Sequence, residues 1–168
     1  MMTITGTETE TGTETTPVTF ALTAGTDAAA TGTAITGVTT SVASTNTLDV
    51  TDVITGTSAT DDSLTVTLGA NFAGFTDDEG SMTGVEVVNL SNDSAVARTF
   101  DASNVTGVTT YNVDATTGDI AINDAQTVST LNLSNQNSGT MTLTMDTTGD
   151  NATTGAGADG GTVATNVA

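Results

Sequence analysis

Apolar and polar residues alternate in short stretches along this chain, with the two-residue period of a half-buried β-strand. The clearest stretches lie at Val18–Leu22, Ala34–Val38, Leu48–Ile54, Leu64–Leu68, Thr99–Asp101, Ile120–Asn123 and Met141–Met145. Glycine, aspartate and asparagine lie between them, as is typical of tight turns. The pattern predicts an all-β fold with almost no helix.

One segment recurs three times, as Gly84–Leu90, Gly107–Val113 and Thr127–Leu133, with asparagines spaced 23 and 20 residues apart. Each copy precedes a second alternating segment, so one unit would contain two strands and two turns. Such a unit buries its apolar face by stacking on its neighbours. We therefore expect an extended, repeat-built β-solenoid or solenoid-like thin sheets. The alternative is an immunoglobulin-type β-sandwich, in which the similarities would be coincidental.

Stacking would align equivalent residues of successive units. The amides of Asn89, Asn112 and Asn132 would lie ~4.8 Å apart and bond as a ladder, whereas without stacking each would face water. The apolar residues on either side of each asparagine share one face of the strand, because side chains alternate between the two faces with a period of two. With the second strands they would form the core: Val88, Leu90, Tyr111, Val113, Leu131, Leu133, Phe100, Ile122 and Leu143.

Patterning also divides the chain into three parts. Residues 1–15 have no alternating apolar partner and are expected to be a flexible Thr/Glu-rich linker. Residues 16–148 hold the alternating stretches and form the β-repeat module. Residues 149–168 are rich in Gly, Ala and Thr and are expected to be a tail or linker.

Charge narrows the possible functions. The chain has 20 acidic residues against one basic residue, Arg98, and its formal net charge is −19. Such a surface repels phosphate backbones and anionic membranes, so we expect neither nucleic-acid binding nor membrane insertion. Cysteine and histidine are absent and only 3% of residues are aromatic, which argues against an enzyme.

Oxygen ligands remain, and they suit calcium. Asp101, Asp124 and Asp146 follow the second strands at similar intervals, and a cation between stacked carboxylates would offset their repulsion. Three loops supply further candidates. The full set of candidate calcium ligands is Asp49, Asp52, Asp61, Asp62, Asp77, Asp78, Glu79, Asp101, Asp124 and Asp146. The alternative is that these loops stay solvated and that each corner aspartate forms an Asx-turn.

Several segments resemble the β-rich repeat domains of Gram-negative S-layer proteins and related large adhesins secreted by the type I route. They are Thr19–Asp27 with Thr31–Thr33, Asp62–Val66 and Gly84–Leu90. The resemblance implies an extracellular, cell-surface module that assembles into calcium-dependent lattices or adhesive stalks. The calcium repeats that many members carry have one approximation here, Gly155–Asp159.

Taken together, these features predict a structural module that self-associates into a lattice or filament with calcium. Calcium would also allow contact with a cell-surface polysaccharide. The alternative function is a monomeric receptor- or ice-binding adhesin module, which would bind its target without assembling.

Overall fold

The computed structural model describes residues 18–57, 61–92, 94–115, 118–126, 128, 130–135, 140–145 and 162–166. Their regular structure consists of β-strands alone, which confirms the predicted all-β class. β-branched and small residues dominate these strands, and β-branched residues in particular favour the extended backbone of a strand. Across these described residues there is no helix of the length and apolarity needed to span a bilayer.

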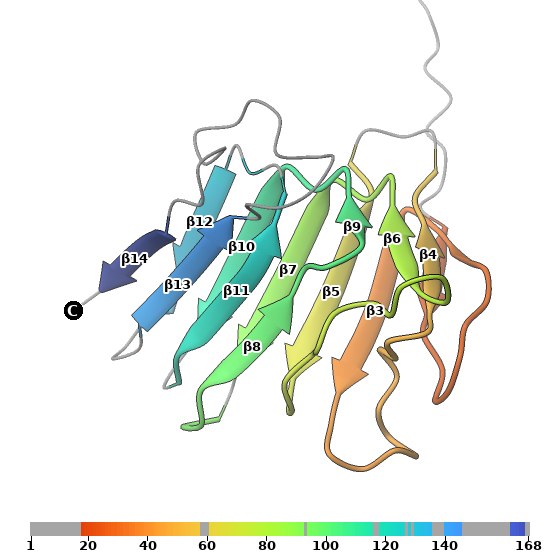
Figure 1. The fold of residues 1–168 in the computed structure, drawn as a ribbon, viewed down its shortest axis with the longest axis horizontal. Coiled ribbons are helices and arrows are strands. Elements are labelled where there is room, and N and C mark those ends of the chain that lie inside the picture. Colours follow the sequence, from red (N-terminus) through yellow and green to blue (C-terminus); the bar gives the residue numbers. More distant parts are fainter. Residues whose placement is uncertain are drawn as a thin grey trace, which may run out of the picture.

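The largest sheet has six strands in the order β1-β3-β5-β7-β10-β12, all parallel. The strands are β1 (Thr19–Ala21), β3 (Ala34–Thr39), β5 (Ser63–Leu68), β7 (Val87–Asn92), β10 (Thr110–Ala115) and β12 (Thr130–Ser134). Spatial order follows chain order, so each strand lies beside the next one that the chain contributes (Figure 1).

Two four-stranded sheets complete the molecule. The β2–β9 sheet contains β2 (Ala30–Thr31), β4 (Val53–Thr55), β6 (Ser81–Thr83) and β9 (Val105–Thr106), all parallel. The β8–β14 sheet contains β8 (Arg98–Asp101), β11 (Ile120–Ala125), β13 (Thr140–Met145) and β14 (Thr162–Asn166). Its last strand, β14, pairs antiparallel with β13.

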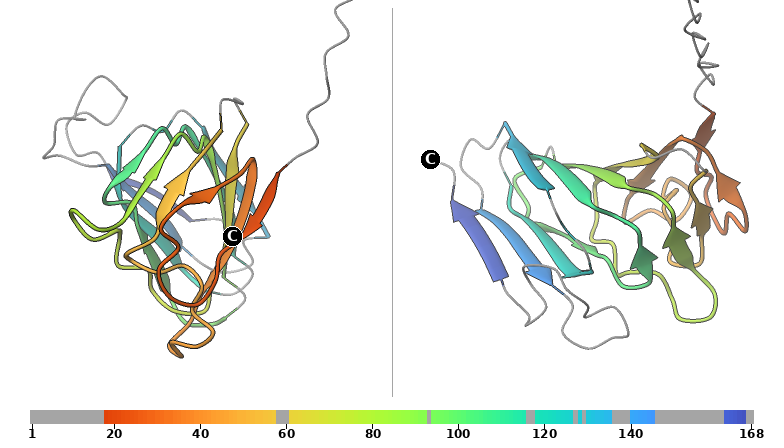
Figure 2. Two further views of the ribbon diagram at one scale, coloured as in Figure 1. Left: turned by 90° about the vertical axis from the view of Figure 1, so that its right-hand side faces the viewer. Right: turned by 90° about the horizontal axis from the view of Figure 1, so that it is seen from above.

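After each strand from β1 to β10, the chain leaves the six-stranded sheet, enters another sheet and returns one position further along. After β12 it continues into β13 and β14 of the β8–β14 sheet. Early passes visit the β2–β9 sheet and late passes the β8–β14 sheet, while the pass after β7 visits both through β8 and β9. Seen from the side, the sheets lie on different sides of one interior (Figure 2). An immunoglobulin-type β-sandwich is built from antiparallel sheets. The mainly parallel pairing seen here does not agree with that alternative.

The interior is filled by columns of apolar side chains in register. In the six-stranded sheet Ile35, Leu64, Val88 and Tyr111 are aligned and at most 1% exposed. In the β8–β14 sheet Phe100, Ile122 and Leu143 are aligned and buried. One continuous cluster joins all three sheets, and Leu131 and Leu133 of β12 are half-buried against it. The predicted core is therefore confirmed.

Glycines permit close approach at one corner. Gly56 N–H donates to the carbonyl of Thr83 at 2.8 Å, and a Cβ on Gly56 would lie 1.6 Å from the carbonyl oxygen of Gly84. Gly84 has a left-handed φ of +65°, which glycine adopts without steric cost. The glycine that opens the first recurring segment thus marks a corner where two successive passes touch.

Two differences from the sequence-based expectations concern strand positions. The second strand expected at Leu48–Ile54 is β4, which begins only at Val53, because Asp49–Asp52 forms a turn closed by Asp52 N–H and the Asp49 carbonyl at 3.2 Å. Residues Thr162–Asn166, within the expected tail, form strand β14. The expected linker at residues 1–15 lies outside the described residues.

Candidate functional site

Asparagine side chains form a hydrogen-bonded ladder on the outward face of the six-stranded sheet. Asn132 Nδ2 donates to Asn112 Oδ1 at 2.8 Å, and Asn112 Nδ2 donates to Asn89 Oδ1 at 2.7 Å. Asn89 Nδ2 continues the line to Thr65 Oγ1 at 3.1 Å. The ladder predicted from the recurring segments is confirmed, and it extends one strand further than the asparagines do.

The ladder runs through a face that we call the ladder face: the outward residues of β1, β3, β5, β7, β10 and β12. Next to the ladder column, Thr67, Ser91, Asp114 and Ser134 are aligned, and Ser91 Oγ donates to Thr67 Oγ1 at 3.2 Å. Of the residues described on this face, Asp114 alone is charged. A hollow of about 260 Å³ lies over Asn89, Asn112 and Asp114. This face can offer hydrogen bonds to a neutral partner.

The acidic candidates lie at corners, and the first group surrounds Asp52. Its side chain is fully buried; Oδ1 accepts a hydrogen bond from the backbone N–H of Asp27 and Oδ2 from that of Asp49, both at 2.8 Å. Asp49 in turn accepts from Thr51 N–H in an Asx-turn. Asp52 therefore ties two successive corners together. Asp27 is not among the residues predicted from the sequence, because no local pattern places it beside a residue 25 positions away.

Burial raises the pKa of Asp52 to about 6. The two backbone N–H groups stabilise the carboxylate and lower the pKa, while the nearby charges of Asp27 and Asp49 raise it. The folded state consequently binds a proton more readily than the unfolded state, in which the pKa is near 3.8.

This shift predicts a pH dependence of stability. As pH falls from about 7 through 6, the folded state takes up a proton that the unfolded state does not, so the free energy of unfolding contributed by Asp52 rises. Urea denaturation at several pH values measures the free energy of unfolding of the wild type and of Asp52→Asn. Between pH 7 and 6 the variant is expected to lack the rise in free energy of unfolding that Asp52 contributes. The exposed neighbour variant Asp61→Asn is the control. Equal slopes for the wild type and Asp52→Asn would contradict the prediction.

The second group is Asp61 and Asp62. Asp61 is exposed, whereas Asp62 is buried and accepts hydrogen bonds from the backbone N–H and hydroxyl of Thr57. Asp62 N–H donates to Glu86 Oε2 at 3.0 Å. Asp62 therefore points into its own corner rather than outward with Asp61. Glu86, which follows the first recurring glycine, joins this corner and was missed by the sequence analysis.

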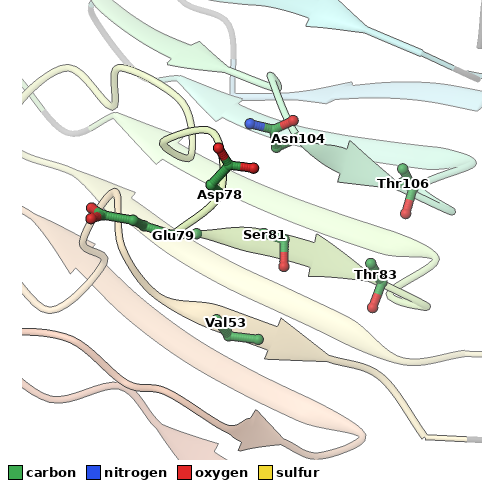
Figure 3. A pocket seen from close by; sticks show the side chains of 8 residues that line it. Val53, Asp78, Glu79, Ser81, Thr83, Asn104 and Thr106 are labelled. Atoms are coloured by element: carbon green, nitrogen blue, oxygen red, sulfur yellow. The ribbon is translucent and has the colours of Figure 1, made fainter. Parts of the chain in front are cut away.

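The third group is the turn Asp77–Glu79, which borders a polar shelf on the β2–β9 sheet (Figure 3). The shelf is a hollow of about 410 Å³ lined by Val53, Asp78, Glu79, Gly80, Ser81, Thr83, Asn104 and Thr106. Asp78 and Glu79 are exposed at one end of it. Asp77 is held apart, since its Oδ1 accepts from Asn104 Nδ2 at 2.8 Å. Two carboxylates and three hydroxyls thus face one open shelf.

The expected column of Asp101, Asp124 and Asp146 is interrupted. Asp101 pairs with Asn123, one residue after the aligned pair Phe100 and Ile122, so Asp124 lies one position beyond it. Against β13, β11 also has one extra residue between Ile122 and Ala125, where Asp124 adopts a left-handed φ of 53°. Asp101 accepts a hydrogen bond from Ser103 N–H, which is the alternative Asx-turn. Asp146 lies outside the described residues. The predicted alignment of Asp101 with Asp124 is therefore wrong.

Within the described ranges, no three Asp or Glu side chains are placed to hold a metal ion together. The described carboxylates of Asp27, Asp49, Asp52, Asp62 and Asp101 accept backbone N–H groups instead, so they fix corners. Asp78 and Glu79 are both exposed at the border of the polar shelf, where their side chains point in different directions (Figure 3).

Comparison with known proteins gives no relative: no protein-family model, no curated protein and no solved structure matches the chain.

Proposed function

We propose that this chain is a structural module of the cell exterior, built as a β-solenoid and self-associating with the help of calcium. The observation that carries the proposal is the register of the six-stranded sheet, in which core and ladder columns continue from strand to strand. A sheet of this kind grows by adding equivalent strands, and its stability accumulates through neighbour contacts. That construction suits a spacer or wall.

The chemistry of the side chains supports a structural rather than a catalytic role. Histidine and cysteine are absent from the chain, and the carboxylates of Asp49, Asp52 and Asp101 accept hydrogen bonds from backbone N–H groups of their own corners. General acid–base catalysis needs a titratable group that faces substrate. Asp52 has the raised pKa of such a group, but its two oxygens are both engaged within the corner.

Calcium enters the proposal as a bridge between copies. Two chains of charge −19 repel one another, and divalent cations reduce this repulsion where carboxylates approach. Asp78 and Glu79 are exposed at the edge of the polar shelf and supply oxygen ligands that a second copy would complete (Figure 3).

A calcium titration tests the proposal. Without divalent ions the chain is expected to elute as a monomer in size-exclusion chromatography, and millimolar calcium is expected to give larger species that electron microscopy resolves as filaments or sheets. Magnesium at equal concentration is expected to act more weakly, since it dehydrates reluctantly. A chain that stays monomeric throughout the titration would overturn the proposal.

Matched variants separate calcium ligation from charge screening. Asp78→Asn/Glu79→Gln and Glu8→Gln/Glu10→Gln each remove two negative charges. We expect the shelf variant to need several-fold more calcium than the control variant. Equal responses of both variants would mean that calcium only screens the charge of the whole chain.

A second candidate function is a monomeric receptor- or ice-binding module, and the ladder face favours it. Thr36 and Thr65 are aligned with the ladder, on a sheet face that is regular and almost uncharged. A monomer that shows thermal hysteresis, lost in Thr65→Tyr, would support this candidate over assembly.

A further inference from the structure

The two ends of the molecule are not equivalent, and only the six-stranded sheet reaches both. The β2–β9 sheet receives its strands from passes up to β9, and the β8–β14 sheet from β8 onward. At the C-terminal end the β8–β14 sheet continues past β13 to β14, whereas the six-stranded sheet stops at β12 (Figure 1). Among the described strands, none lies beside β12 at the position that β14 occupies beside β13.

The inward side chains of β12 are less buried than those of the strand before it. Leu131 and Leu133 are half-buried, whereas their aligned partners Tyr111 and Val113 on β10 are both 1% exposed. The inward side chains thus change from buried on β10 to half-buried on the neighbouring strand β12. A further strand with an apolar inward residue would bury both leucines.

Of the strands that the structure describes, β10 alone pairs with β12, which is the last strand of its sheet. Thr130 N–H donates to the Thr109 carbonyl at 3.1 Å, so by alternation the N–H groups of Leu131 and Leu133 point to the opposite edge. β12 contains no charged residue, proline or bulge, which are the usual means of protecting an edge strand. The chain has 20 acidic residues, but none of them lies on β12. A strand of a second copy would therefore meet no charged side chain on β12.

The other end of the same sheet carries a complementary edge. β1 is bonded to β3 on one side, and its sequence Thr19-Phe20-Ala21 is uncharged. Phe20 occupies the inward column as the partner of Ile35, yet it is only half-buried. Thr19 and Ala21 face outward and are exposed.

We propose that β12 of one copy pairs in parallel with β1 of a second copy, so that one six-stranded sheet continues into the next. Thr130 would lie opposite Thr19, Leu131 opposite Phe20 and Asn132 opposite Ala21. Parallel pairing keeps the strand direction of the whole sheet and joins Phe20 to the core column of Leu131. The inference rests on the proposed self-association and adds a strand-pairing contact to the calcium contact proposed at the shelf.

The pairing is head-to-tail and therefore does not close on itself. Each copy uses β12 at one end and leaves β1 free at the other, which is a heterologous contact that produces open filaments. The competing arrangement, β12 against β12 of a second copy, would be isologous and would end at a dimer.

Cysteine cross-linking tests the register, because the natural chain contains no cysteine. Thr19 and Thr130 are exposed, outward-facing and at opposite edges of one sheet, so a disulfide between them must join two copies. Neighbouring strands lie ~4.8 Å apart, within the Cα separation that a disulfide accepts. With Thr19→Cys/Thr130→Cys, oxidation in calcium is expected to give a ladder of dimers, trimers and longer species on a non-reducing gel.

Four controls accompany this variant. Thr19→Cys and Thr130→Cys alone are expected to give no ladder, and Thr19→Cys/Ser134→Cys none either, because its two sulfurs would be ~13 Å out of register. Asn132→Cys alone tests the isologous arrangement. Circular dichroism of each reduced variant verifies that the sheet content is kept.

The outcomes are distinguishable. If the wild type assembles in calcium while Thr19→Cys/Thr130→Cys gives no ladder, the interface is overturned and the proposed function stands. If Asn132→Cys alone gives dimers in high yield, the isologous arrangement replaces ours. If the wild type forms no assembly under any condition, the proposed function and this interface are both overturned.

Discussion

Replacement of Phe100 by alanine is expected to lower the free energy of unfolding by about 3–5 kcal/mol, the usual range for a large aromatic residue removed from a core. Phe100 is fully buried on β8 and stacks on Phe72, with ring centroids 5.2 Å apart and planes inclined by 27°. Phe72 also contacts Phe75 edge to face at 5.0 Å. The cavity would therefore open at the one pass that supplies strands to all three sheets.

Urea denaturation followed by circular dichroism measures this loss. Val96→Ala is the matched control, because Val96 precedes the same strand and is 57% exposed; its effect is expected to lie within about 0.5 kcal/mol. Hydrogen exchange gives a second readout, in which protection should fall in β8 and in its aligned neighbour β11. A loss confined to β8 would show that the passes pack independently of one another.

Replacement of Gly56 by alanine is expected to cost about 3 kcal/mol or more, because the new methyl group has no space. Its Cβ would lie 1.6 Å from the Gly84 carbonyl oxygen and 2.8 Å from Oδ2 of Asp62. Both obstacles are held in place, the first by the backbone and the second by hydrogen bonds from Thr57. The corner has to separate before alanine fits.

Gly84→Ala is the informative comparison at the same corner. Gly84 has a left-handed φ of +65°, but its Cβ would meet its nearest atom at 3.8 Å. Conformational strain alone is expected to cost about 1–2 kcal/mol. Thermal unfolding of both variants measures the difference. Equal losses would mean that the corner relaxes freely and that the contact between successive passes contributes little.

The sequence was most informative where one side-chain column repeats. Asn89, Asn112 and Asn132 occur in the same place of three similar segments, and that repetition was sufficient to predict β7, β10 and β12, the inward residues of these strands and the ladder. Here local pattern and long-range pairing agree, because each strand pairs with the equivalent strand of the next pass. Thr65, the fourth member of the ladder, was not predicted, because the sequence around it does not match the recurring segment.

The corners were harder to predict, because their contacts depend on turn geometry rather than on period. Asp101, Asp124 and Asp146 are almost evenly spaced in sequence, yet the register of β8 and β11 places Asp101 beside Asn123 and leaves Asp124 out of the column. Asp27 and Asp52 lie 25 residues apart and meet only because two passes stack. Single-sequence patterning defines neither the register of two paired strands to within one residue nor the contact between two corners.

Residues joined by the ladder are 24, 23 and 20 positions apart in sequence, yet their hydrogen bonds measure 3.1, 2.7 and 2.8 Å. The corners thus absorb differences in length without disturbing the register of the strands. Loop closure becomes only slowly less favourable with length, so we expect an exposed corner such as Ser41–Thr45 to tolerate an inserted peptide. The same strand stack can therefore carry different loops at fixed spacing, as a display scaffold whose exposed sequence varies independently of its core.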